Sequence, residues 1–293
     1  MVAGEGSDTN TENENGGMIM MKKMDSYEVP YGYRARVGLV VVGPNLNPTP
    51  EIRRMLPDYV QMRETRIHMD PVVNIAECSK LSGPLANAAG LLAEGICSPL
   101  LGNRSAIAFA CTAGSLVGGP GWDKKEVAMM ENATADSPST RYIDGRLVPS
   151  KGFPATTTAT AVEEAMHFMG FKKIVITGPY IDELNERFRA FYTNSGFEVL
   201  KVNGLGIEDL YEMGATKPSQ AYKAAMDVFD PKADGIFIGC TNFRCSDVIE
   251  QLEQDTGKPV VTANQATAWH LMKLLGIGEP IEGYGELLRR PRL

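Results

Sequence analysis

The chain has 293 residues, 43% of them hydrophobic and 22% charged, values typical of globular proteins. This length predicts two lobes of about 120 residues each, or one large sheet. The formal net charge of −7 argues against nucleic acid and anionic membranes as partners, because both require a basic surface. No apolar run approaches the roughly 20 residues that span a bilayer, and the polar, acidic start is unlike a signal peptide. We therefore expect a cytoplasmic protein that binds neither nucleic acid nor membrane.

Cysteine and histidine usage argues against disulfides and metal sites. The chain has five cysteines, an odd number, and none of them belongs to a CxxC pair. Reduced thiols are therefore expected. The three histidines, His68, His167 and His270, are scattered and show no metal-ligand spacing, so the sequence predicts no metal.

The first half of the chain begins with a polar segment and then becomes α/β. Residues 1–30 are low in apolar content and are expected to form a disordered leader. VGLVVVG at 37–43 is a short apolar run that ends in Gly-Pro, as in a strand buried on both faces. Thr49, Pro50 and Glu51 then predict the start of a helix.

The second half repeats this pattern. KKIVITG at 172–178 also ends in Gly-Pro, and a helix is expected from Asp182 to a stop at Gly196. In each half a second apolar strand ends in Cys-Thr, at Cys111-Thr112 and at Cys240-Thr241. The similar spacing of these features favours an internal duplication.

The alternation of strands and helices predicts parallel sheets, whose ligands bind beyond the carboxyl ends of the strands. If the two halves pack with these ends facing, four loops meet at one cleft: residues 43–47, 111–115, 178–180 and 240–242.

The same pattern divides the chain into two lobes. We assign residues 31–153 to the first lobe and 154–264 to the second, and we expect a C-terminal helix at 265–293 to pack back on the first lobe. The irregular segment 118–154 is interpreted either as a lid or partner-contacting loop, or as a surface insertion.

Cys111 and Cys240 are the predicted catalytic residues. A thiol with a pKa of about 8.5 is mostly protonated at neutral pH and needs hydrogen-bond donors to react. The turn after each cysteine can supply backbone N–H groups, which, with the hydroxyls of Thr112, Ser115 and Thr241, could hold a carboxylate without Lys or Arg. Two thiols beside one substrate carbon can move a proton between its faces, or one can add to a double bond while the other moves the proton.

The competing interpretation of each cysteine is a small buried hydrophobic residue. The matching places of Cys111 and Cys240 in the two halves favour function for this pair. The remaining cysteines lack such placement and are interpreted as structural: Cys78, Cys97 and Cys245. Asn47 and Tyr180, in the loops at the mouth of the cleft, are candidate hydrogen-bond donors to a substrate carboxylate.

Several stretches carry a family resemblance: PATTTATAVEEAM at 154–166, GPYIDELNERF at 178–188, GIFIGCTNF at 235–243 and GYGELL at 283–288. From about Val37 to Leu288 the chain resembles the aspartate/glutamate racemase superfamily, in the branch that holds maleate cis-trans isomerases and arylmalonate decarboxylases. Asn47, Thr49 and Glu51 form an NxTxE pattern similar to the first substrate-binding loop of maleate isomerases.

The resemblance implies two Rossmann-like lobes related by a pseudo-twofold axis, each with a parallel sheet flanked by helices, an active site in the cleft between them, and no cofactor. It implies that Cys111 is a nucleophile that adds to the alkene of maleate, and that Cys240 is the general acid/base. The substrate-binding residues are predicted to be Asn47, Thr112, Ala113, Tyr180 and Thr241. The expected partner is a small carboxylate substrate, and the expected assembly is a homo-oligomer, a dimer or a dimer of dimers.

One departure leaves the substrate open. Leu210 falls where maleate isomerases carry a carboxylate-binding asparagine, and an apolar side chain there, as in decarboxylases, suits a substrate with one less polar end. Arylmalonate decarboxylases have glycine at the first cysteine position, whereas this chain keeps both thiols. We therefore favour an isomerase, with an arylmalonate-type decarboxylase, a two-cysteine racemase and a non-catalytic carboxylate sensor as alternatives.

Overall fold

The computed structural model describes residues 31–97, 104–137, 142–143, 146–147 and 152–292. The leader predicted at 1–30 lies outside the described residues, and so do residues 138–141, 144–145 and 148–151 of the irregular segment 118–154. Within the described part of the chain, no helix combines the length and the apolar character that a membrane crossing requires.

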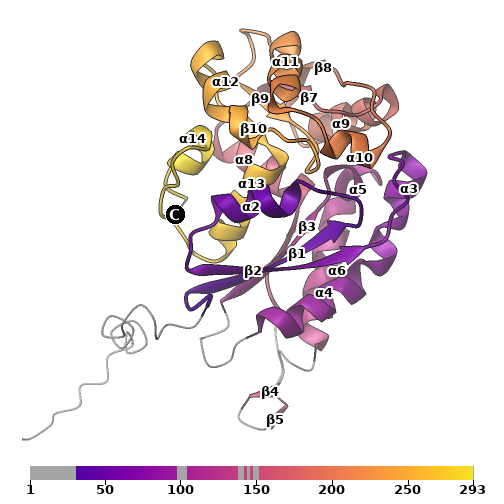
Figure 1. Cartoon of the computed structure of the whole chain (residues 1–293), viewed down its shortest axis with the longest axis vertical. Coiled ribbons are helices and arrows are strands. Elements are labelled where there is room, and N and C mark those ends of the chain that lie inside the picture. The colour runs from indigo at the N-terminus through magenta and orange to yellow at the C-terminus, as the bar shows by residue number, and fades with distance from the viewer. Residues whose placement is uncertain (1–30, 98–103, 138–141, 144–145, 148–151, 293) are drawn as a thin grey trace, which may run out of the picture.

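The first lobe is built on a parallel four-stranded sheet in the order β2-β1-β3-β6. Its strands are β1 (Ala35–Val42), β2 (Val60–Ile67), β3 (Ser105–Ala110) and β6 (Ala155–Thr157). Its helices are α2 (Pro48–Met55), α3 (Ile75–Lys80), α4 (Ser82–Ile96), α5 (Thr112–Leu116) and α6 (Trp122–Asp136). Two short antiparallel strands of two residues each, β4 (Tyr142–Ile143) and β5 (Arg146–Leu147), lie apart from this sheet (Figure 1).

The second lobe has the same plan, with a parallel sheet in the order β8-β7-β9-β10. Its strands are β7 (Lys173–Thr177), β8 (Glu198–Val202), β9 (Gly235–Ile238) and β10 (Val260–Thr262). Its helices are α9 (Asp182–Asn194), α10 (Leu210–Gly214), α11 (Pro218–Val228), the 3-10 helix η2 (Ser246–Val248) and α12 (Ile249–Thr256). Figure 1 shows this lobe above the first one.

The two sheets confirm the predicted architecture. In each lobe the strand that ends in Gly-Pro lies second in the sheet, beside the strand that ends at the cysteine. Every residue of β3 and β9 is buried, because helices cover both faces of a parallel sheet and its central strands are apolar throughout.

The lobe boundaries differ from those expected in two places. The first sheet reaches Thr157, beyond the predicted boundary at 153, because Ala155–Thr157 pair with β3 through the backbone despite their polar sequence. The C-terminal segment contacts both lobes: α13 (Ala263–Leu274) packs against α2 and β3 and also contacts β10, whereas α14 (Gly285–Arg289) packs against β10 and α12 of the second lobe.

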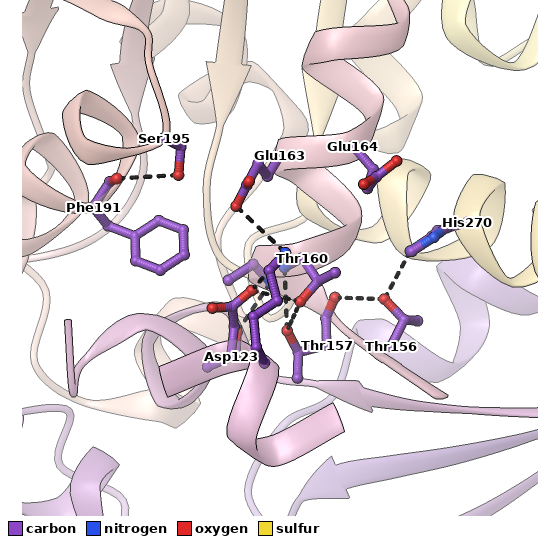
Figure 2. Close-up of polar contacts among 12 residues, drawn as sticks. Asp123, Thr156, Thr157, Thr160, Glu163, Glu164, Phe191, Ser195 and His270 are labelled. Atoms are coloured by element: carbon purple, nitrogen blue, oxygen red, sulfur yellow. Dashed lines mark hydrogen bonds and ion pairs between the residues drawn. The ribbon is translucent and has the colours of Figure 1, made fainter. Parts of the chain in front are cut away.

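A run of threonines joins the two lobes at the start of α8 (Thr158–Phe168) (Figure 2). The Thr157 hydroxyl caps α8 by accepting from the Thr160 N–H at 3.1 Å, and the Thr160 hydroxyl donates to Asp123 Oδ2 at 2.7 Å. Thr156 Oγ1 lies 2.8 Å from Nδ1 of His270 on α13. Helix α8 contacts β6 of the first sheet and β10 of the second, so this polar cluster lies where the lobes meet.

Candidate functional site

A small pocket lies at the carboxyl ends of β1, β3, β7 and β9 and is lined from both lobes, and it is called the cavity below. Its lining residues are Val42, Asn45, Met69, Val73, Cys78, Cys111, Ala113, Tyr180, Leu210, Cys240 and Thr241. Both predicted catalytic cysteines therefore face the same space. Among the described residues, no three His, Cys, Asp or Glu side chains are grouped as metal ligands.

Cys111 occupies the N-cap of α5, directly after β3. Its side chain accepts a hydrogen bond from the Gly114 N–H at 3.3 Å. A Cβ at position 114 would lie 3.1 Å from the Cys111 sulfur and 2.9 Å from Leu81 Cδ1, so the absence of a side chain at Gly114 leaves room for this close approach. Burial and the nearby Cys78 raise the pKa of Cys111 well above its usual value, while the Gly114 N–H opposes this.

Cys240 has a different environment, with more hydrogen-bond donors. Its φ of 81° makes it the only non-glycine residue with a left-handed backbone in the described part of the chain. The Tyr180 hydroxyl and the N–H groups of Asn242 and Phe243 act as donors that lower the pKa of its thiol, and the Phe243 N–H also donates to the Cys240 carbonyl at 3.3 Å. Burial raises the pKa of Cys240 to about 11, against the opposing effect of these three donors.

The two thiols are therefore unequal acids. Both are protonated at neutral pH because burial penalises a thiolate. The three donors at Cys240 stabilise its thiolate, whereas Cys111 has the single donor from Gly114. Cys240 is thus the thiol more suited to exchange protons.

Tyr180 lies where the sequence predicted, in the loop after β7. Its side chain is buried, lines the cavity and reaches Cys240. Burial raises its pKa well above the usual value, and the neighbouring thiols Cys240 and Cys111 act in the same direction. Its hydroxyl thus stays protonated and remains a donor.

The first loop places a different asparagine in the cavity from the one predicted. Asn47 does not line it, because its Nδ2 donates to the carbonyl oxygens of Asn242 at 2.8 Å and Gly214 at 3.1 Å, which links the lobes. Asn45 lines the cavity instead, and its Oδ1 is buried with no hydrogen-bond partner among the described residues. Asn45 and Asn47 flank Leu46 in the same loop, and no motif in the sequence distinguished one asparagine from the other.

The remaining predicted binding residues divide between lining and structural roles. Ala113 and Thr241 line the cavity, but the Thr241 hydroxyl donates to the Ala110 carbonyl at 3.2 Å. Thr112 is buried and does not line the cavity, and its hydroxyl has no partner among the described residues. The Ser115 hydroxyl donates to the Cys111 carbonyl at 2.7 Å and accepts from the Ala159 N–H at 3.1 Å, so it is structural.

One wall of the cavity is apolar and includes a third thiol. Val42, Met69, Val73 and Leu210 contribute hydrocarbon or thioether surface. Cys78 of α3 joins them, although only a structural role was expected for it from the sequence. Segments of both lobes close this wall, since Val73 N–H donates to the Glu208 carbonyl and Leu210 N–H to the Pro71 carbonyl, both at 2.8 Å.

Comparison with known proteins identifies the family. Residues 140–288, slightly more than half of the chain, match the family model described as arylmalonate decarboxylase. The chain belongs to the arylmalonate decarboxylase family. This confirms the resemblance inferred from the sequence motifs.

Relatives in this family are enzymes with two different names. The chain is 30% identical over 139 residues to arylmalonate decarboxylase of Bordetella bronchiseptica, a match that covers 46% of the chain and 58% of that enzyme. It is 24% identical over 262 residues to maleate isomerase of Geobacillus stearothermophilus, covering 86% of the chain and 96% of that enzyme. Family membership alone therefore does not separate decarboxylase from isomerase.

Solved structures of both kinds share the fold. A variant of the maleate isomerase from Pseudomonas putida S16, crystallised with maleate, matches with a TM-score of 0.77 at 22% identity, over 87% of this chain and 97% of that one. A crystal structure of arylmalonate decarboxylase matches with a TM-score of 0.66 at 22% identity, over 86% and 98% of the two chains.

Proposed function

We propose that this member of the arylmalonate decarboxylase family is a cofactor-independent isomerase of a small dicarboxylate, similar in action to maleate cis-trans isomerase. The observation that carries the proposal is that one thiol from each lobe, Cys111 and Cys240, lines the same cavity. In the same fold, a mutant of the Nocardia farcinica maleate isomerase carries a covalently bound succinylcysteine intermediate, which supports thiol addition as the reaction.

The unequal thiols suggest an order of proton transfers. The Cys240 thiolate, stabilised by its three donors, accepts the proton of Cys111. The Cys111 sulfur then adds to one alkene carbon, and Cys240 returns the proton to the other. Rotation about the resulting single bond, removal of the same proton by Cys240 and elimination of the Cys111 thiolate give the trans isomer. The proton and the charge on the two sulfurs balance over the cycle.

The apolar wall narrows the substrate class. Leu210, Met69 and Val73 offer no hydrogen bonds to a second polar end. An alkyl group on the substrate would bury apolar surface there, worth roughly 25 cal/mol per Å². We therefore propose a substrate with an apolar substituent, such as a methyl-substituted maleate.

The same wall favours an arylmalonate-type decarboxylation as the second candidate. A decarboxylase needs only one thiol to protonate the carbanion left by loss of carbon dioxide, and Cys240 with Tyr180 beside it could act alone. Under that reaction Cys111 has no chemical step, which is why we rank it second.

Proton NMR in deuterated water with maleate, methylmaleate and phenylmalonate tests both candidates. The isomerase predicts a trans alkene product, and the decarboxylase predicts a monoacid with one deuterium. Replacing Cys111→Ser or Cys240→Ser should each lower turnover by roughly 10²-fold or more, whereas Cys97→Ser, outside the cavity lining, should not. Turnover of no substrate by the wild-type protein, or undiminished isomerisation by Cys111→Ser, would exclude the proposed mechanism.

A further inference from the structure

Glu51 of α2 is a buried carboxyl group that the proposed chemistry does not use. Its side chain is 2% exposed. Its Oε2 accepts from Asn264 Nδ2 at 2.7 Å, and its Oε1 accepts from the Ser246 N–H at 3.2 Å. Burial raises the pKa of Glu51 above its usual value, while these hydrogen bonds oppose the shift. Glu51 thus reaches from the first lobe into the segments that flank Cys240.

Asn264, at the start of α13, connects Glu51 to the cysteine loop. The same Nδ2 that donates to Glu51 also donates to the Thr241 carbonyl at 2.9 Å, while its Oδ1 is buried with no partner among the described residues. A carboxylate only accepts hydrogen bonds, so Glu51 fixes which way the amide points. With the amide reversed, its oxygen would face the Thr241 carbonyl oxygen and repel it.

The Thr241 carbonyl belongs to the peptide that follows the strained Cys240. A left-handed φ at a non-glycine residue persists only where surrounding contacts hold it. The Asn264 amide and the Thr241 hydroxyl bond to Ala110 are two such contacts. This peptide leads directly into Asn242 and Phe243, whose N–H groups lower the pKa of Cys240.

We propose that Glu51 and Asn264 are positioning residues for Cys240. The carboxyl group orients the amide, the amide holds the Thr241 carbonyl, and the held peptide aims the backbone donors at the sulfur. Only the consequence for turnover rests on the proposed function, since the effect on the thiol itself requires no substrate.

Replacement of Glu51→Gln tests the orientation directly. Glutamine has one acceptor oxygen where Glu51 has two, so its NH2 group must face either Asn264 Nδ2 or the Ser246 N–H, and one of these two hydrogen bonds is lost. Where the lost bond is the one to Asn264, its amide is free to reverse and release the Thr241 carbonyl. The readout is the rate at which iodoacetamide alkylates each cysteine of the native protein at pH 8, followed by peptide mass spectrometry. We expect Cys240 to react about tenfold more slowly, as loss of its donors disfavours the thiolate by about one pKa unit. Cys111, in the same cavity, serves as the internal control for access and should keep its rate.

Two further variants keep the test decisive. Asn264→Ala removes the donor to Thr241 while Glu51 remains, and it should slow Cys240 by a similar factor. Glu64→Gln, an exposed glutamate on β2 that bonds Thr49, should change neither rate. Unchanged or faster labelling of Cys240 in folded Glu51→Gln and Asn264→Ala proteins would overturn the inference. If wild-type protein turns over no dicarboxylate, the proposed function fails while this labelling result still stands.

Discussion

Cys240 combines a strained backbone with three hydrogen-bond donors at its sulfur. A left-handed φ at a residue with a Cβ costs about 1–3 kcal/mol, and such strain is concentrated at functional sites. Here the strained residue directly precedes Thr241, Asn242 and Phe243, and the N–H groups of the last two lower the pKa of its thiol. Cys111 lies in an unstrained N-cap with one donor, so the two cysteines differ in chemistry although they occupy matching places in the lobes.

Replacing Tyr180→Phe should separate the contribution of its hydroxyl from that of the backbone donors. Since Tyr180 lowers the pKa of Cys240 from what burial alone would give, its loss should raise that pKa. Wild-type kcat/KM should rise about tenfold per pH unit between about pH 7 and 9, below the Cys240 pKa of about 11. The variant should keep this slope with rates at least tenfold lower. A wild-type profile that is flat over this range would contradict the role of the Cys240 thiolate.

At the scale of elements, the site consists of loops and helix starts that follow parallel strands. The cysteines follow β3 and β9, and Asn45 and Tyr180 follow β1 and β7. This placement follows from the parallel sheet, in which all carboxyl ends lie at one edge. Short helix α5 then fixes Cys111, since Trp122 Nε1 donates to the Gly114 carbonyl at 3.0 Å from the start of α6.

Replacing Gly114→Ala should disrupt this cap. The new Cβ would lie 2.9 Å from Leu81 Cδ1 and 3.1 Å from the Cys111 sulfur, so the Leu81 side chain and the sulfur or the turn must shift. Overpacking of this kind typically costs about 1–3 kcal/mol in the free energy of unfolding. We expect a loss of this size in urea denaturation and slower alkylation of Cys111. Gly83→Ala, where a Cβ meets no atom within 4 Å, is the matched control and should be neutral or stabilising.

At the scale of the whole molecule, polar contacts between the lobes close the cavity. Asn242 Oδ1 accepts from the Leu46 N–H at 2.7 Å, Asn47 donates back to the Asn242 carbonyl, and Thr241 reaches Ala110. On another part of the interface, His270 of α13 bonds Thr156 at the end of the first sheet (Figure 2). The site thus exists only in the docked pair of lobes. The expected homo-oligomer and cytoplasmic location stay predictions.

The buried His270 makes stability sensitive to acid. Burial lowers the pKa of His270 from 6.5 to about 4, against the opposing charge of Glu164. The unfolded chain therefore takes up a proton at a pH where the folded protein does not. The free energy of unfolding should fall as the pH drops from about 6.5 to about 4, by roughly 2 kcal/mol at pH 5. Urea denaturation at pH 7 and pH 5 measures this fall.

Variants at two histidines show whether His270 causes this fall in the free energy of unfolding. His270→Gln should remove this part of the acid sensitivity, whereas His68→Gln, at a side chain that is 90% exposed, should leave it intact. Equal falls in stability for wild-type protein and His270→Gln would show that another group is responsible.

The sequence by itself determined the strands that end in Gly-Pro and Cys-Thr, their repetition and hence the two-lobed parallel fold, because burial on both faces leaves continuous apolar runs. It also placed Cys111, Tyr180 and Cys240 at one cleft, since strand ends are local features. Only the tertiary structure decided which loop side chains face inward. Asn45 replaced Asn47, and Cys78 joined the wall from a helix without a motif, because inward direction depends on backbone angles and on how the lobes dock. The link from Glu51 to Asn264, and through it to the Cys240 loop, likewise joins positions 213 residues apart in the chain, which no local pattern records.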